Sequence, residues 1–220
     1  MAKFYAFENR AFKNHDDAGM NVYNDLTKHG EAPRCPKCNC FVGSLPVLPP
    51  VHVELELFGH YFADVAFTGD QLLVSARLRE AYIESQFSGL SSFYPVSVIS
   101  AKSRKRKLRN ECPIYFLAYV SNGRAAVDTT VSGFEWEAEP SCLECREGMI
   151  KRWSRIVIEP GTWDGKDVFR PRGLSGTILV TERFRDMYIG HGFRNGVFIP
   201  AEEFGHDFYP WERKSRSVSN

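Results

Sequence analysis

The sequence lacks both a charge excess and a long apolar run. Its 220 residues include 28 lysines and arginines against 27 acidic residues, so the formal net charge is only +1. A nearly neutral chain has no overall attraction for nucleic acid or for an anionic membrane. No stretch approaches the roughly 20 apolar residues that span a bilayer, and Met1–Phe4 leads into polar sequence rather than into the apolar region of a signal peptide. We therefore expect no membrane partner and a cytoplasmic location.

The sequence also lacks the usual signatures of catalysis. Its glycine-containing stretch, with Gly165, Gly173 and Gly176, does not precede a Lys-Ser or Lys-Thr pair, so it is not a phosphate-binding loop. The histidines are scattered, and none forms a convincing nucleophile–base–acid spacing. We expect that the protein is not an enzyme; an enzyme of unrecognised type is the weakest of the hypotheses.

What the sequence does contain is two CxxC pairs, Cys35 with Cys38 and Cys142 with Cys145. Each pair places two sulfurs on one tight turn, which is half of a tetrahedral thiolate site. Four cysteines, without a neighbouring group that would activate a water molecule, predict a closed, structural Zn²⁺ site. Metal-free thiols and redox-active disulfides are the alternatives, although neither pair has a thioredoxin-like context. Cys40 is a weaker candidate ligand, and we expect both Cys40 and Cys112 to be ordinary buried or half-buried thiols.

An internal repeat surrounds these cysteines. Leu73–Ile83 aligns without a gap with Leu179–Ile189, and Phe87 and Phe193 keep the same spacing. The CxxC pairs keep nearly that spacing, and Pro95 matches Pro200 after a shift of one residue. Agreement in order, spacing and residue type indicates two structurally equivalent lobes. A pseudo-two-fold arrangement of such lobes would bring the two CxxC turns face to face.

The patterns together predict an α+β fold of mainly antiparallel strands, with two equivalent short helices in two pseudo-repeat lobes joined by a Cys₄ zinc site. We place the lobes at 1–120 and 121–220, within one compact unit, with a flexible polar tail at 212–220.

Several local signals make this prediction specific. Val51–Leu57 alternates strictly between apolar and polar residues, which is typical of a half-buried strand. Ser75 is placed to cap a helix from about 76 to 86, with Leu78, Tyr82 and Ile83 on its buried face.

Weaker signals complete the expected order of elements. We expect a helical turn near Val22–Leu26, and a hairpin in which 125–130 returns along 114–120. Pro95 predicts that its strand lies at a sheet edge or carries a bulge.

Two charged stretches are candidates for binding. The run Lys102–Arg109 could contact phosphate in a zinc-ribbon-like nucleic-acid-binding protein, although it lacks interleaved aromatic residues. We expect this run to be a solvated loop between two strands, and we do not expect nucleic acid as a partner. Glu135, Glu137 and Glu139 alternate with apolar residues and could face a basic partner, or form the solvated face of a sheet.

The chain resembles the double-CXXCG-motif family of bacterial proteins and the wider group of polymorphic-toxin immunity proteins. The segments that carry this resemblance, from about residue 35 to 204, are Cys35–Cys38, Val53–Gly59, Leu73–Arg79, Gly89–Val96, Cys142–Cys145, Trp163–Phe169 and Ile178–Phe184. The family motif has glycine after each second cysteine, whereas Asn39 and Arg146 stand there in this chain. Asparagine tolerates the left-handed backbone conformation of such a glycine, and arginine does so less readily.

The resemblance implies an immunity protein that binds and neutralises a cognate toxin in the cytosol. On this interpretation the zinc ion is architectural, and the acidic residues Glu135, Glu137 and Glu139 are candidate partner-binding residues if the toxin is basic.

Overall fold

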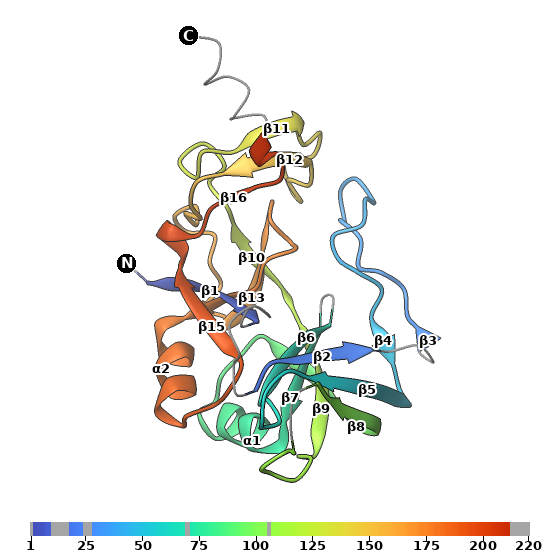
Figure 1. Ribbon diagram of the computed structural model, residues 1–220. Helices are drawn as coiled ribbons and strands as arrows, with labels where there is room; N and C mark the ends of the chain where they lie inside the picture. The colour runs from blue at the N-terminus through green and yellow to red at the C-terminus, as the bar shows by residue number, and fades with distance from the viewer. Residues whose placement is uncertain (1, 10–17, 24–27, 69–70, 105–106, 212–220) are drawn as a thin grey trace.

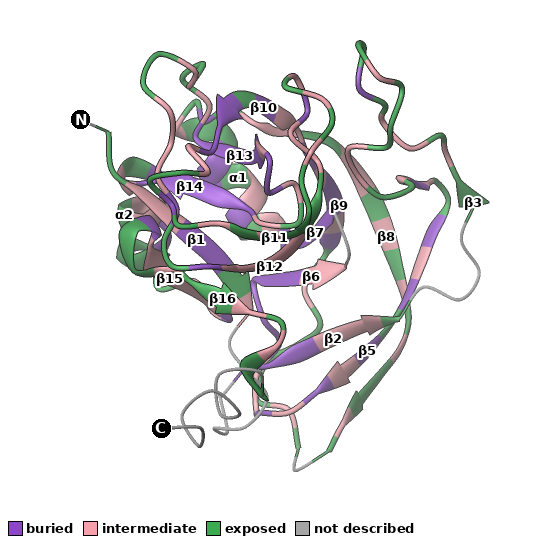
Figure 2. Ribbon diagram, turned by 90° about the horizontal axis from the view of Figure 1, so that it is seen from above, coloured by how far each residue is buried: buried purple, intermediate pink, exposed green. Residues whose placement is uncertain are grey.

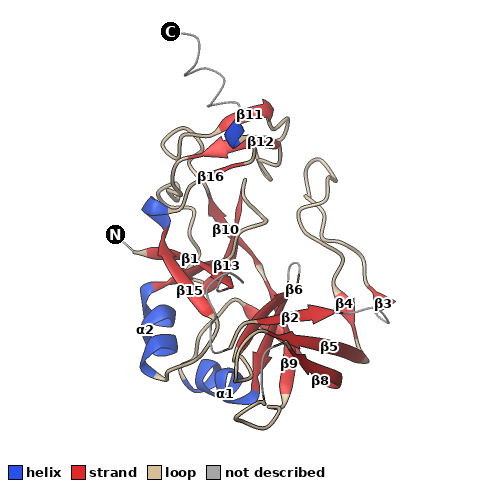
Figure 3. Ribbon diagram, viewed as in Figure 1, coloured by secondary structure: helices blue, strands red, loops and turns tan. Residues whose placement is uncertain are grey.

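Strands dominate the protein, and two short helices lie next to each other at one end (Figure 1, Figure 3). This confirms the α+β class with mainly antiparallel strands, two equivalent helices and a cysteine cluster that joins two regions. None of the described helices is long and apolar enough to cross a membrane. The computed structural model describes residues 2–9, 18–23, 28–68, 71–104 and 107–211, so the expected flexible tail at 212–220 lies outside the described residues.

A six-stranded sheet forms the first half, in the order β2-β5-β8-β9-β7-β6. All its neighbours are antiparallel except β5 and β8, which run parallel. The elements of this half are β2 (Met20–Tyr23), β5 (Val51–Leu57), β6 (Val65–Thr68), β7 (Gln71–Ser75), α1 (Ala76–Glu84), β8 (Leu90–Ser103) and β9 (Tyr115–Val120).

A five-stranded sheet forms the second half, in the order β10-β13-β14-β1-β15, and only β10 and β13 pair in parallel. Its elements are β1 (Phe4–Asn9), β10 (Asn122–Ala126), β13 (Val168–Arg172), β14 (Leu179–Thr181), α2 (Glu182–Gly190), β15 (Gly196–Pro200) and the 3₁₀ turn η1 (Ala201–Glu203).

The first strand of the chain belongs to the second sheet. β1 lies between β14 and β15, with Tyr5 opposite both Val180 and Pro200. In the first half β9 has the same place between β7 and β8, with Phe116 opposite Val74 and Pro95. The repeated unit is therefore β6-β7-α1-β8-β9 in one half and β13-β14-α2-β15-β1 in the other. The division into lobes at residue 120 stays a prediction, but residues 4–9 pair with strands of the second half.

Both helices begin as the sequence predicts. The side chain of Ser75 caps α1 by accepting a hydrogen bond from the N–H of Leu78, and Thr181 caps α2 through the N–H of Phe184. These caps satisfy backbone donors that the first turn of a helix leaves free. Leu78 and Tyr82 are buried as predicted, whereas Ile83 is 48% exposed, so its assignment to the buried face was wrong.

One apolar core lies between the two halves, and the central strands are buried (Figure 2). Equivalent residues of both halves belong to it, namely Tyr82 of α1 and Tyr188 of α2, and Val74 and Val180 of the preceding strands. The rings of Phe87 and Phe184 are 5.7 Å apart, edge to face. Because apolar burial contributes about 25 cal/mol per Å², this shared core holds the halves together independently of any metal.

The cysteine pairs lie in hairpins outside the two large sheets. The first hairpin joins β3 (Lys28–His29) to β4 (Val47–Leu48). The second joins β11 (Glu135–Ala138) to β12 (Met149–Trp153), and β16 (His206–Asp207) extends it to a three-stranded sheet.

Two local predictions require correction, and a third holds in one of its two alternatives. Residues 20–23 form strand β2 rather than the start of a helical turn, because β2 pairs along the edge of β5; residues 24–26 of that prediction lie outside the described residues. β10 does not return along β9 but crosses to pair with β13. β8 is internal rather than an edge strand, and Pro95 follows a register shift between Ser91 and Tyr94, which agrees with the predicted bulge.

Candidate metal centre

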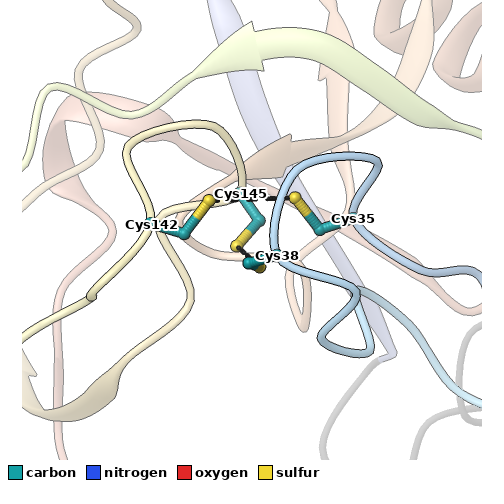
Figure 4. Close-up of side chains that lie close together, drawn as sticks. All are labelled: Cys35, Cys38, Cys142 and Cys145. Atoms are coloured by element: carbon teal, nitrogen blue, oxygen red, sulfur yellow. Dashed lines mark hydrogen bonds between the residues drawn. The ribbon is translucent and has the colours of Figure 1, made fainter.

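The two hairpins bring all four predicted ligands together. The sulfur atoms of Cys35, Cys38, Cys142 and Cys145 lie within 4.8 Å of one another (Figure 4). The Sγ atoms of Cys35 and Cys142 are 3.9 Å apart, and those of Cys38 and Cys145 are 3.6 Å apart. Each cysteine thus faces its equivalent in the other half, as the repeat predicts.

These distances fit a tetrahedral metal site. Zn–S bonds of about 2.3 Å in a regular tetrahedron place neighbouring sulfurs about 3.8 Å apart. The two measured separations lie on either side of this value. They are far longer than the roughly 2.05 Å of a disulfide, and all four residues are free cysteines. Four protein thiolates would complete the coordination of Zn²⁺ and leave no position open for substrate, which is the arrangement of a structural site.

The backbone takes the same turn at both pairs. The N–H of Asn39 donates to the carbonyl of Cys35, and the N–H of Arg146 donates to that of Cys142, both at 2.9 Å. Asn39 has φ 60° and Arg146 has φ 58°. Both residues therefore adopt the left-handed conformation that favours glycine, at the positions where the family motif has glycine. Arg146 therefore adopts the left-handed conformation, and the second turn has the same backbone geometry as the first.

Arg146 has contacts that stabilise its unfavourable backbone. Its Nη1 donates to the carbonyl of Val127 at 3.0 Å, and its guanidinium pairs with Glu159. A second arginine, Arg172, donates from Nη1 to the carbonyl and carboxylate of Glu144, at 3.1 and 2.7 Å. These contacts hold the second cysteine turn against β13 and the loop that follows β10.

The electrostatics favour a cation between the sulfurs. The backbone N–H groups of Cys145 and Glu144 lower the pKa of Cys142 to about 7. The N–H of Cys38 similarly lowers the pKa of Cys35, whereas burial raises the pKa of Cys145. The first cysteine of each pair therefore ionises more readily than the second. A positive ion between the sulfurs would stabilise all four as thiolates.

The remaining cysteines do not join this cluster. Cys40 and Cys112 are both exposed, so the prediction of buried or half-buried thiols was wrong for each. Cys40 lies just beyond the left-handed residue Asn39, and it is not part of the metal-binding group despite its closeness in sequence.

The acidic strand lies apart from the cysteines, along the exposed edge of the three-stranded sheet. Glu135, Glu137 and Glu139 are all exposed, as the alternation predicts. Glu135 pairs with Arg152 on β12, with 3.2 Å between Oε2 and Nε, and Glu137 accepts a hydrogen bond from the hydroxyl of Tyr209. Two of the three carboxylates therefore already have partners within the chain.

The basic run is only partly a loop. Lys102 lies within β8, and residues 105–106 lie outside the described residues. The guanidinium of Arg104 pairs with Glu56 and lies over the ring of Phe58. Arg109 reaches Tyr61. The aromatic residues that the run lacks in sequence are thus supplied by the segment after β5.

Sequence reasoning missed the two buried aspartates that anchor the helices. Asp64 accepts hydrogen bonds from Ser75 and from two nitrogens of Arg77, and Asp167 is bound in the same way by Thr181 and Arg183. The signal was an Asp-Val pair ahead of each repeated strand, at Asp64-Val65 and Asp167-Val168. The two Asp-Val pairs are not separated by the same number of residues as the aligned segments, so an alignment without gaps does not match them.

No protein-family model and no curated protein matches this chain.

Proposed function

We propose that this chain is an immunity protein that binds and neutralises a cognate toxin in the cytosol, with a structural zinc ion at its four clustered cysteines, and that it is not an enzyme. The observation that carries the proposal is the pair of equivalent cysteine turns, each followed by a residue with left-handed backbone. This is the conformation that the glycine of the double-CXXCG motif would take, so it supports the resemblance on which the immunity function rests.

The chemistry of the cluster agrees with a binding protein. Four thiolates saturate a zinc ion, so the ion has no position for a substrate or for an activated water. Among the described residues, no other group of three or more His, Cys, Asp or Glu side chains could hold a metal. The function would then depend on surfaces that the fold and the metal position.

The direct test is co-expression with a candidate toxin encoded beside this chain. We expect growth to be restored, and the two purified proteins to form a stoichiometric complex. An empty vector and an unrelated zinc protein serve as controls. If the toxin stays fully active while the chain accumulates in folded form, the immunity function is excluded.

The acidic strand remains one candidate contact for a basic toxin. Replacing Glu135, Glu137 and Glu139 together by glutamine should slow association, because complementary charge mainly raises the association rate. Unchanged association kinetics at low salt would remove this strand from consideration.

Nucleic-acid binding through residues 102–109 is the second candidate, and the contacts of Arg104 with Phe58 and of Arg109 with Tyr61 favour it. It predicts binding that weakens steeply with salt, because released counterions drive it. Replacing Lys102 and Lys107 by glutamine should then weaken binding, whereas the immunity function predicts no such binding.

A further inference from the structure

The two halves repeat the same strand–helix unit with its buried aspartate. They differ in the residues that surround the start of the helix, α1 in the first half and α2 in the second. Ala76 and Glu182 are equivalent first residues of the helices: the N–H of Ala76 donates to the carbonyl of Ile114, and that of Glu182 to the carbonyl of Lys3. In the second half Lys3 forms an ion pair with Glu182 at 3.2 Å. In the first half the same two positions hold alanine and isoleucine, so an ion pair is replaced by an apolar pair.

This apolar pair is open to solvent. The side chain of Ile114 is 69% exposed, and Ile114, Pro113 and Ala76 line a hollow of about 490 Å³. An exposed branched aliphatic residue at a position where the sister half has lysine does not contribute to the core. Because the free energy falls when apolar surface is removed from water, the hollow is suited to receive an apolar group from a partner.

The rim of the hollow is cationic. Arg77 and Arg194 line it, against the single carboxylate of Asp64. Arg194 stacks over Tyr61 with its guanidinium carbon 3.7 Å from the ring centroid, and Nη1 of Arg194 is buried without a hydrogen-bond partner among the described residues. Arg109 donates to the hydroxyl of Tyr61 and, with Arg194, lowers the pKa of Tyr61. The positive charge of Arg194 at this rim favours a negatively charged group on a partner.

The second half differs at the positions of Arg194 and Tyr61. Ser88 stands where Arg194 does: its N–H binds Asp167 as the N–H of Arg194 binds Asp64. Three residues before Asp167 stands Asp164, whereas three before Asp64 stands Tyr61. Arg77 has its counterpart in Arg183, which binds Asp167 in the same way. Arg194 and the ring of Tyr61 have no counterpart of the same type, so they are additions to a motif that holds the helix of the second half without them.

We infer that this hollow, lined by Tyr61, Ala76, Arg77, Pro113, Ile114 and Arg194, is a docking surface for a protein segment that presents an apolar side chain flanked by carboxylates. An apolar centre surrounded by arginine and tyrosine is typical of the energetically dominant part of protein interfaces. A nucleic-acid strand fits less well, because the centre is aliphatic and Arg194 covers one face of Tyr61, whereas binding of successive bases relies on a row of open aromatic faces. This inference rests on the proposed function in naming the partner, since the segment would belong to the neutralised toxin.

The test needs no toxin. A random dodecapeptide library displayed on phage is panned against the full chain, and the enriched peptides are measured against two variants. Ala76→Glu with Ile114→Lys transplants the pair of the second half and leaves the net charge unchanged, while Arg194→Gln removes one cation and keeps the backbone bonds to Asp64. Thermal unfolding confirms that each variant is folded, and the equally conservative Arg155→Gln, at an exposed arginine outside the hollow, is the control.

We expect enriched peptides that combine an apolar residue with flanking Asp or Glu, and an affinity about tenfold lower for both variants, because loss of a central anchor usually costs more than about 1 kcal/mol. Arg155→Gln should bind as the wild type does. No enrichment, enriched peptides without acidic residues, or equal binding to all variants would overturn the inference. So would oligothymidylate that binds the wild type and displaces the peptides. Toxin neutralisation is measured separately, so failure of the docking surface is distinguished from failure of the immunity function.

Discussion

Asp64 accepts a hydrogen bond from the backbone N–H of Arg194, 2.9 Å away and 130 residues later in the chain. Asp167 accepts the equivalent bond from Ser88, at 3.0 Å. Each aspartate thus binds side chains at the start of the helix in its own half, and it also binds the loop that follows the helix of the other half. Arg77 lies over Phe193 and Arg183 over Phe87 in the same reciprocal way, at 4.6 and 4.5 Å from the ring centroids.

Because each aspartate binds residues of both halves, its loss should reduce the stability of the protein more than the loss of an exposed acidic residue does. Asp167→Ala should lower the free energy of unfolding by about 2–3 kcal/mol, because it removes a carboxylate that satisfies Thr181, Ser88 and Arg183. Arg183 is largely exposed and can be solvated, which limits the loss. Urea unfolding measures the effect, and Asp186→Ala, at an exposed position of α2, should change stability by less than about 0.5 kcal/mol. Equal effects of the two substitutions would contradict the role of Asp167.

Gly89 is required where the two halves touch. Its φ is +108°, and an added Cβ would lie 1.7 Å from the carbonyl oxygen of Val168. Gly89→Ala should therefore destabilise the protein by about 3 kcal/mol or more, since backbone must move. Gly190→Ala is the matched control, because a Cβ there meets nothing within 4 Å and alanine is favoured in a helix. Equal thermal midpoints for the two variants would show that the loop moves away without cost.

The left-handed residue of the second cysteine turn offers a paired comparison. Arg146→Gly and Arg146→Ala both lose the bonds to Val127 and Glu159. Only glycine relieves the backbone strain at φ 58°, so the glycine variant should be about 1 kcal/mol more stable than the alanine variant. Chemical unfolding of both proteins with metal bound gives the difference. A more stable alanine variant would mean that the turn relaxes to another conformation.

The cysteine cluster predicts a stoichiometric metal. Elemental analysis should find about one zinc per chain, and Cys142→Ser should lose it. Because the shared core holds the halves together, the variant should stay folded, with faster hydrogen exchange confined to the segments around 30–46 and 139–148. Cys112→Ser, at an exposed cysteine outside the cluster, should retain the metal. A wild-type protein that contains no metal and has protected hairpins would contradict the site.

The sequence by itself determined the features that local chemistry encodes. The CxxC spacing identified Cys35, Cys38, Cys142 and Cys145 because two sulfurs on one turn are a local pattern. Strict alternation gave β5 its bounds, and Ser75 marked the start of α1, because strand periodicity and helix capping act over a few residues. The repeat predicted the equivalence of the halves, and with it the pairing of the cysteine turns.

Tertiary structure alone decided what depends on residues far apart in the chain. β1 joins the second sheet, and β10 leaves β9 for β13, because strand pairing follows whichever edge the folded chain offers and leaves no local signature. The exchange between Asp64 and Arg194 and the hollow around Ile114 arise in the same way. Each brings together side chains from several distant segments, and their distances and burial exist only once both halves have folded onto their common core.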